Sequence, residues 1–184
     1  MVSVVRGINA IGSTATYLPE VLDIAWGTGR RISAILALRY RDIRLTEGGP
    51  HGSILWPADT DKTGKEWLVP MSTEVRAAIN RILSDRPGLG TAYVFPAVNN
   101  ATKPVSKDVV AGWLRKAEQL AGVPKHEGSA FHAYRRGWAT RRKHLPVVDV
   151  ARAGGWSDQQ TLTTIYQQPD PATMYVVVSQ PARA

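Results

Sequence analysis

The chain has 184 residues, a length that fits one domain able to bury a core of its own. Hydrophobic residues make up 43% and charged residues 21%, which is typical of a globular domain. The absence of Cys excludes disulfides, thiolate metal sites and Cys nucleophiles, and suits a reducing compartment. No apolar run approaches the roughly 18 residues of a membrane-spanning helix, and no secretory signal is visible. We therefore expect a cytoplasmic protein with no membrane partner.

The net charge of +8, with a pI near 10, favours a polyanionic partner, most simply nucleic acid. A basic protein without such a partner is the alternative. The basic side chains also cluster, because the segment from Lys125 to His144 holds six Lys or Arg and one acidic residue. This segment carries few large apolar residues on an opposing face, which disfavours membrane binding.

The first predicted elements are two helices separated by a glycine break. Pro19 favours the start of a helix over residues 20–26, which Gly27-Thr28-Gly29 ends. A second helix is expected to begin near Arg30. Arg31 then lies in its first turn, where helix N–H groups attract anions.

The pattern changes to a hairpin after residue 42. Residues 53–56 and 66–69 are typical of short strands, and the polar segment 59–65 between them is typical of a turn. Lys62 is expected at or near the tip of this antiparallel hairpin.

The rest of the chain is predicted to be mostly helical. Ser72 and Ser106 are expected to cap helices that run to about residue 84 and residue 120. Further helices are predicted over residues 131–144, 147–154 and 158–167. A short apolar, β-branched tail follows at 174–178. The expected fold class is therefore mainly α with a small antiparallel β-sheet (α+β).

One motif within these helices suggests chemistry. His132 and Arg135 are three residues apart, so they share a face of the predicted helix. A guanidinium presents a rigid fork of donors to phosphate oxygens, and an imidazole can give or take a proton near neutral pH. The alternative is a solvated basic helix with an incidental His.

Five segments in order resemble the catalytic domain of the tyrosine recombinases, the phage-integrase family. The resemblance covers about residues 19–168, and the motifs are jointly specific although each alone is weak. The segments are Thr28-Gly29-Arg30-Arg31-Ile32-Ser33, Lys62 in its hairpin, His132-x-x-Arg135, Gly155-Trp156 and Thr163-Thr164-Ile165-Tyr166. The resemblance implies the fold of the DNA breaking-rejoining enzymes and site-specific recombination of double-stranded DNA, in a bacterium or phage-infected host.

The same resemblance assigns a role to each matching residue. Arg31 and Arg135 would clamp the scissile phosphate, and Tyr166 would attack it to form a 3′-phosphotyrosine. The remaining catalytic roles are general acid for Lys62, general base or phosphate donor for His132, and indole N–H donor to phosphate for Trp156. Contacts to DNA are expected from Arg30, Lys65, Arg136, Arg141 and Arg142. No metal or cofactor is expected.

Several of these assignments have competitors. The alternative to a phosphate contact by Trp156 is packing in the hydrophobic core. The competing residues are Arg30 for the role of Arg31, Lys65 for that of Lys62, and Tyr175 for that of Tyr166. For the whole chain, the alternatives are a non-catalytic basic DNA-binding domain of the same fold and a DNA-relaxing enzyme of the type IB topoisomerase kind.

The chain also departs from the family pattern. Ala34 stands where an acidic residue is usual, and Gln167-Gln168 follow the tyrosine in place of x-His. The interval from Trp156 to Tyr166 is about one residue longer than expected.

The predicted organisation is a linker or remnant over residues 1–18 and a catalytic domain over residues 19–184. The amino-terminal core-binding domain of the family is expected to be absent from this chain, which suggests a truncated or excised catalytic domain. We expect a homo-tetramer on DNA in which the tail at 174–178 packs on a neighbouring protomer, with a monomer as the alternative for a fragment.

Overall fold

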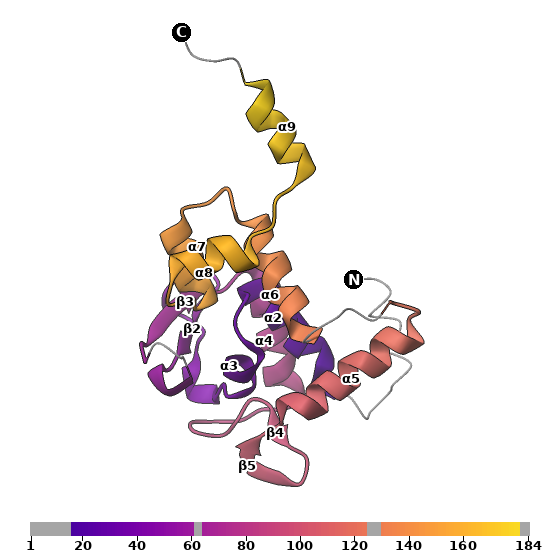
Figure 1. The fold of residues 1–184 in the computed structure, drawn as a ribbon. Helices are drawn as coiled ribbons and strands as arrows, with labels where there is room; N and C mark the ends of the chain where they lie inside the picture. The colour runs from indigo at the N-terminus through magenta and orange to yellow at the C-terminus, as the bar shows by residue number, and fades with distance from the viewer. Residues whose placement is uncertain (1–15, 61–63, 125–129, 181–184) are drawn as a thin grey trace.

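Helix α2 (Leu18–Thr28) lies at the centre of the domain (Figure 1). It packs against four other helices, α3 (Ile32–Leu36), α4 (Thr73–Asp85), α5 (Lys107–Leu120) and α6 (Ala130–Arg141). The computed structural model describes residues 16–60, 64–124 and 130–180. Pro19 stands in the first turn of α2, and Gly29 ends the helix in the left-handed conformation with φ 64°. The helix predicted over residues 20–26 is therefore confirmed, with longer bounds.

The predicted hairpin is confirmed and belongs to a three-stranded antiparallel sheet in the order β1-β2-β3. β2 (Ser53–Trp56) pairs with β3 (Trp67–Pro70), with Trp56 opposite Trp67. β1 (Ile43–Arg44), which the sequence pattern did not indicate, pairs with the other edge of β2. Lys62 lies outside the described residues.

Helices α4 (Thr73–Asp85) and α5 (Lys107–Leu120) begin where the serines predicted them to begin. Each serine hydroxyl accepts a hydrogen bond from the backbone N–H three residues later, at 3.3 Å. The connection between the two helices holds a second small antiparallel sheet, which was not predicted. Its strands are β4 (Pro96–Ala97) and β5 (Asn100–Pro104). Two 3-10 turns lie before α4, namely η2 (Tyr40–Asp42) and η3 (Ala58–Thr60).

The carboxy-terminal half is helical, and one predicted helix is divided. The elements are α6 (Ala130–Arg141), α7 (Val147–Gly154), α8 (Gln159–Thr161), η4 (Leu162–Tyr166) and α9 (Pro171–Ser179). The helix predicted over 158–167 is thus one short α turn, α8, followed by a π turn, η4. In the described ranges, no helix is long and apolar enough to cross a bilayer.

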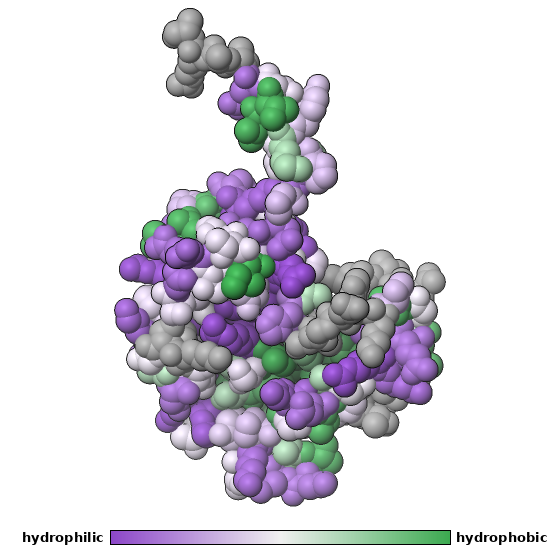
Figure 2. All heavy atoms as spheres, in the orientation of Figure 1, coloured by the Kyte–Doolittle hydropathy of each residue, from purple (hydrophilic) through white to green (hydrophobic). Residues whose placement is uncertain are grey.

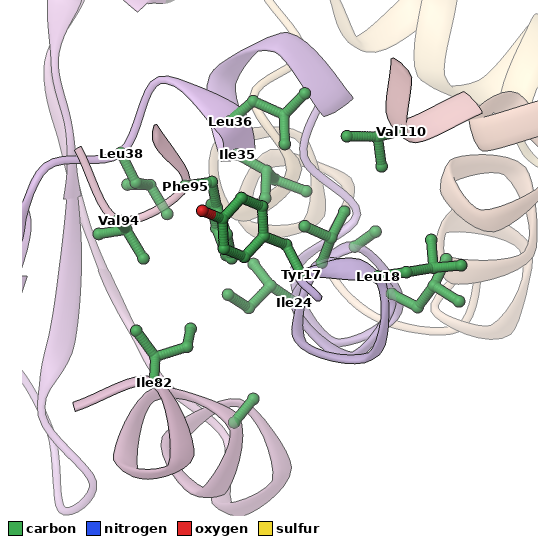
Figure 3. Packing of buried hydrophobic residues seen from close by; sticks show 14 of the residues in the cluster. Tyr17, Leu18, Ile24, Ile35, Leu36, Leu38, Ile82, Val94, Phe95 and Val110 are labelled. Atoms are coloured by element: carbon green, nitrogen blue, oxygen red, sulfur yellow. The ribbon is translucent and has the colours of Figure 1, made fainter. Parts of the chain in front are cut away.

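Two hydrophobic clusters hold these elements together. The larger joins α2 to α3, α4, α5 and β2, and Figure 3 shows Tyr17, Ile24, Ile35 and Phe95 packed within it. Because Tyr17 and Leu18 are buried there, the core includes residues before the predicted domain start at 19. The smaller cluster joins α6, α7 and η4 and consists of Trp138, Ala139, Val150, Ala151, Trp156 and Leu162.

Helix α9 projects away from the rest of the domain (Figure 1). Its side chains are exposed although most are apolar, and Figure 2 shows hydrophobic atoms on this projection. The exposed apolar residues are Met174, Tyr175, Val176, Val177 and Val178. The described part of the chain therefore does not bury the apolar side chains of α9.

Two leucine truncations should separate the core from the surface. Leu114 on α5 has an exposed fraction of 0%, whereas Leu89 is 88% exposed. We expect Leu114→Ala to lower the free energy of unfolding by about 2–5 kcal/mol, through lost burial and a cavity. Leu89→Ala should change it by less than about 0.5 kcal/mol. Urea denaturation followed by circular dichroism measures both values, and equal losses would contradict the assigned core.

Candidate active site

The site is built on the carboxy-terminal end of α7. The helix ends at Gly154, and Gly155 follows in the left-handed conformation with φ 70°. The last carbonyl groups of a helix lack partners within it and carry partial negative charge, so this end attracts hydrogen-bond donors that are positively charged. Three arginines occupy it, and two of them, Arg30 and Arg31, lie more than 100 residues away in the sequence.

Arg30 is the most deeply integrated of the three. Its Nε donates to the Ala153 carbonyl at 2.9 Å and its Nη2 donates to the Arg152 carbonyl at 2.8 Å. The guanidinium also lies over the Trp56 ring, 4.9 Å from the centroid, and the residue is only 4% exposed. The Arg30 guanidinium thus ties α7 to the chain after α2, and the residue also lines the cavity described below. Its contact with DNA stays a prediction.

Arg31 and Arg135 meet at one acceptor. Arg31 Nη1 donates to the Gly155 carbonyl at 3.0 Å, and Arg135 Nη2 donates to the same oxygen at 3.3 Å. Arg135 Nη1 also donates to the carbonyls of Gly29 and Gly154. The two arginines of the predicted clamp are thus brought together, with backbone oxygens between their like charges.

Burial and charge both act on Arg135, which is 4% exposed. Burial, followed by the positive charge of Arg31, lowers the pKa of Arg135 to about 9, while the charge of Tyr166 and a hydrogen bond to its side chain act in the opposite direction. The guanidinium therefore remains charged at neutral pH.

Tyr166 is held by aromatic contacts beside this pair. Its ring centroid lies 5.0 Å from that of Trp156 in an edge contact and 6.2 Å from that of His132 in a stacked contact. The Arg135 guanidinium lies 3.4 Å from the Trp156 centroid and 5.2 Å from the Tyr166 centroid. Four of the predicted catalytic residues thus form one contiguous group.

The His132 imidazole stays neutral down to a lower pH than a free imidazole does. Burial lowers its pKa, and the positive charges of Arg135, Arg136 and Arg31 lower it further. A neutral imidazole can accept a proton, which suits a general base.

Trp156 does not donate a hydrogen bond within the described residues. Its indole N–H is buried and has no partner there, and its ring stacks on Trp138 at 5.9 Å. Core packing, the alternative role for Trp156, is thus present in the structure. The free donor is also compatible with the predicted role toward phosphate.

A cavity of about 470 Å³ opens beside this group. Arg31, His132, Arg135 and Tyr166 line it, and Lys107 lines it too. The sequence pattern marked Lys107 only as the first residue of a capped helix, so nothing short of the tertiary fold could assign it to the site.

The π turn explains the long interval before the tyrosine. Gln167 N–H donates to the Leu162 carbonyl at 2.9 Å, a bond that spans five residues where an α-helix spans four. One extra residue is absorbed in this turn. Leu162 therefore remains in the core while Tyr166 reaches the cavity.

The other predicted DNA contacts lie on or near the surface. Lys65 and Arg136 are exposed. The Arg141 guanidinium lies 3.5 Å from the centroid of the Trp26 ring, and that of Arg142 lies over Trp138 and donates to its backbone carbonyl. In the three described ranges, no group of His, Asp or Glu side chains is arranged to hold a metal ion.

The titration of His132 tests the electrostatics of the site. The pKa is expected to lie below the roughly 6.5 of free histidine. Because the unfolded chain then binds this proton more readily, the contribution of His132 to stability is lost as the pH falls from the unfolded pKa to the lower folded one. Titration of the imidazole by NMR measures the midpoint. Arg136→Gln should raise it, and a midpoint above 6.5 in the unsubstituted chain would contradict the assigned environment.

Two adjacent arginines offer a matched test of the hydrogen bonds to α7. Arg135→Met would leave buried carbonyls without donors, so we expect it to lower the free energy of unfolding by about 2–3 kcal/mol. Arg136→Met removes the same charge from an exposed position and should change it by less than about 0.5 kcal/mol. Urea denaturation compares the two, and equal effects would show that Arg135 contributes only surface charge.

Solved structures of recombinases share this fold. XerA recombinase aligns with 98% of the chain at a TM-score of 0.72 and 20% identity, and XerH bound to a palindromic difH substrate in a post-cleavage complex aligns with 96% at 0.71 and 20%. A lambda integrase dimer bound to a COC′ core site aligns with 90% at 0.66 and 16%. The chain spans 62%, 50% and 57% of the lengths of these proteins.

No curated protein sequence matches the chain. The sequence model of the phage integrase family matches residues 4–173, which include every motif described above. The chain therefore belongs to the phage integrase family, the tyrosine recombinases.

Proposed function

We propose that this domain carries out site-specific recombination of double-stranded DNA through a covalent phosphotyrosine. The observation that carries the proposal is the placement of Tyr166 beside His132, Arg135 and Arg31 around one cavity of about 470 Å³. The described residues thus combine a nucleophile, a neutral imidazole and two positive charges. These are the groups that phosphoryl transfer to a tyrosine requires.

The arginines would act on the charge of the phosphate. Arg31 and Arg135 are held close together by the Gly155 carbonyl, so a phosphate in the cavity would meet two positive charges. Negative charge grows on the phosphoryl oxygens as the reaction proceeds, and fixed guanidinium groups stabilise it without having to reorganise. Lys107, on the cavity wall, would add a third charge.

The chemical step would be a transesterification. The Tyr166 oxygen forms a bond to phosphorus while the bond from phosphorus to the 5′-oxygen breaks. His132 accepts the phenolic proton, and Lys62 gives a proton to the departing oxygen. The phosphotyrosine ester keeps the free energy of the broken phosphodiester, so the reverse step can join another strand without ATP.

Assembly on DNA would use the projecting helix. The apolar side chains of α9 are exposed, which is the condition for packing against another protomer. A lambda integrase tetramer bound to a Holliday junction is among the solved structures with this fold, at 15% identity and a TM-score of 0.67. We infer a homo-tetramer on double-stranded DNA, with a monomer expected for the isolated chain.

The nucleophile can be identified by trapping it. A pool of nicked suicide duplexes retains the enzyme covalently on the cleaved strand, and the product is resolved on denaturing gels in the presence of EDTA. We expect an adduct with the unsubstituted chain and at least about a hundredfold less with Tyr166→Phe, which lacks the attacking oxygen.

Tyr175→Phe is the matched control, because it removes the same hydroxyl from an exposed tyrosine on α9. It should form the adduct at the rate of the unsubstituted chain. An adduct that persists in Tyr166→Phe and disappears in Tyr175→Phe would move the nucleophile to the tail. Binding of duplex without any adduct would favour a DNA-binding domain without catalysis.

A further inference from the structure

Thr140 on α6 makes two hydrogen bonds to the chain that leaves the π turn. Its Oγ1 donates to the Tyr166 carbonyl at 3.1 Å, and the Gln168 backbone N–H donates to the same Oγ1 at 3.1 Å. One hydroxyl therefore holds the backbone on both sides of Gln167.

These bonds replace what the turn itself does not supply. Tyr166 is the last residue of η4, so its carbonyl accepts no hydrogen bond from within the helix. The turn is closed one residue later by the bond from Gln167 N–H to the Leu162 carbonyl. Within the described residues, the Tyr166 carbonyl and the Gln168 backbone N–H form hydrogen bonds with Thr140 and with no other group.

Side-chain packing holds the turn at both ends, since the Tyr166 ring contacts Trp156 and His132. The Leu162 side chain is fully buried in the smaller cluster, whereas Thr163, Thr164 and Ile165 are exposed. Ring contacts thus hold the Tyr166 side chain, whereas Thr140 holds the backbone at the end of the turn. Because the helix stops at Tyr166, the carbonyl of that residue needs a donor from outside the turn, which Thr140 supplies.

We propose that Thr140 is a positioning residue that holds Tyr166 in register with the phosphate-binding arginines. α6 carries Thr140 together with His132 and Arg135, so the hydroxyl ties the tyrosine to the same rigid element that supplies those two groups. The inference rests on the proposed function, in which Tyr166 is the nucleophile. Thr140 itself touches neither the phosphate nor the reacting oxygen.

The test replaces the Thr140 hydroxyl by a methyl group, which keeps the shape of the side chain. Thr140→Val should lower the single-turnover rate of adduct formation on the nicked duplex by about tenfold or more, because misplacement of a reacting group by about 1 Å costs up to a hundredfold. Thr140→Ser keeps the hydroxyl and should remain within about threefold of the unsubstituted rate. Thr164→Val is the matched control, since the Thr164 hydroxyl bonds only to the Gln160 carbonyl, and it too should remain within about threefold.

Two further readouts separate positioning from a general structural effect. The affinity for duplex and the pH dependence of the cleavage rate should not change in Thr140→Val, because the ionising groups are the same. Hydrogen exchange of the Gln168 amide should become at least about tenfold faster, and this measurement needs no activity. Thr140→Ala serves the same comparison if Thr140→Val does not fold.

The outcomes distinguish the two proposals. If the unsubstituted chain forms no adduct at Tyr166, the proposed function fails, while the exchange of the Gln168 amide still tests the hydrogen bonds of Thr140. If the adduct forms and Thr140→Val matches its rate, the role of Thr140 is overturned. Equal losses in Thr140→Ser and Thr140→Val, or weaker duplex binding, would also overturn it, because the hydroxyl would then not be the cause.

Discussion

The attraction between the carbonyl end of α7 and three guanidinium groups is the interaction on which the site depends. Arg30, Arg31 and Arg135 come from segments that are separated by more than 100 residues, and each donates to a carbonyl between residues 152 and 155. The close approach of the arginines requires glycine at position 155, where a Cβ would lie 2.5 Å from Arg30 Nη1. A Cβ at Gly154 would lie 2.0 Å from the Trp156 ring.

The same arrangement leaves the site prepared for an anion. The positive charge of Arg31 lowers the pKa of Arg135, and both charges lower the pKa of His132. Backbone carbonyls offset this repulsion only in part, because they carry partial charges. Under the proposed function, a phosphate in the cavity would supply the missing negative charge.

The smaller hydrophobic cluster connects these charges to the tyrosine. Trp138 and Trp156 stack on each other, Trp156 contacts both Arg135 and Tyr166, and Leu162 anchors the π turn in the same cluster. Aromatic rings suit this role because they pack as apolar groups and also present a negative face to a guanidinium. The order of the site is thus maintained by packing as well as by hydrogen bonds.

Much of the fold and the membership of the site followed from local sequence signals. Ser72 and Ser106 start helices through bonds to N–H groups three residues away, and Gly29 ends one because it tolerates a positive φ, so these boundaries depend on neighbours in the chain. The resemblance to the phage integrase family, carried by the order of its motifs, indicated Arg31, His132, Arg135 and Tyr166 as site residues. Tertiary contacts decided what spacing could not. Arg30 and Arg31 are adjacent and chemically identical and both line the cavity, and only the position of Trp56 and the α7 carbonyls buries Arg30 more deeply. The extra residue before Tyr166 became a π turn because Leu162 had to stay buried while the tyrosine reached the arginines, a condition imposed by packing across the fold.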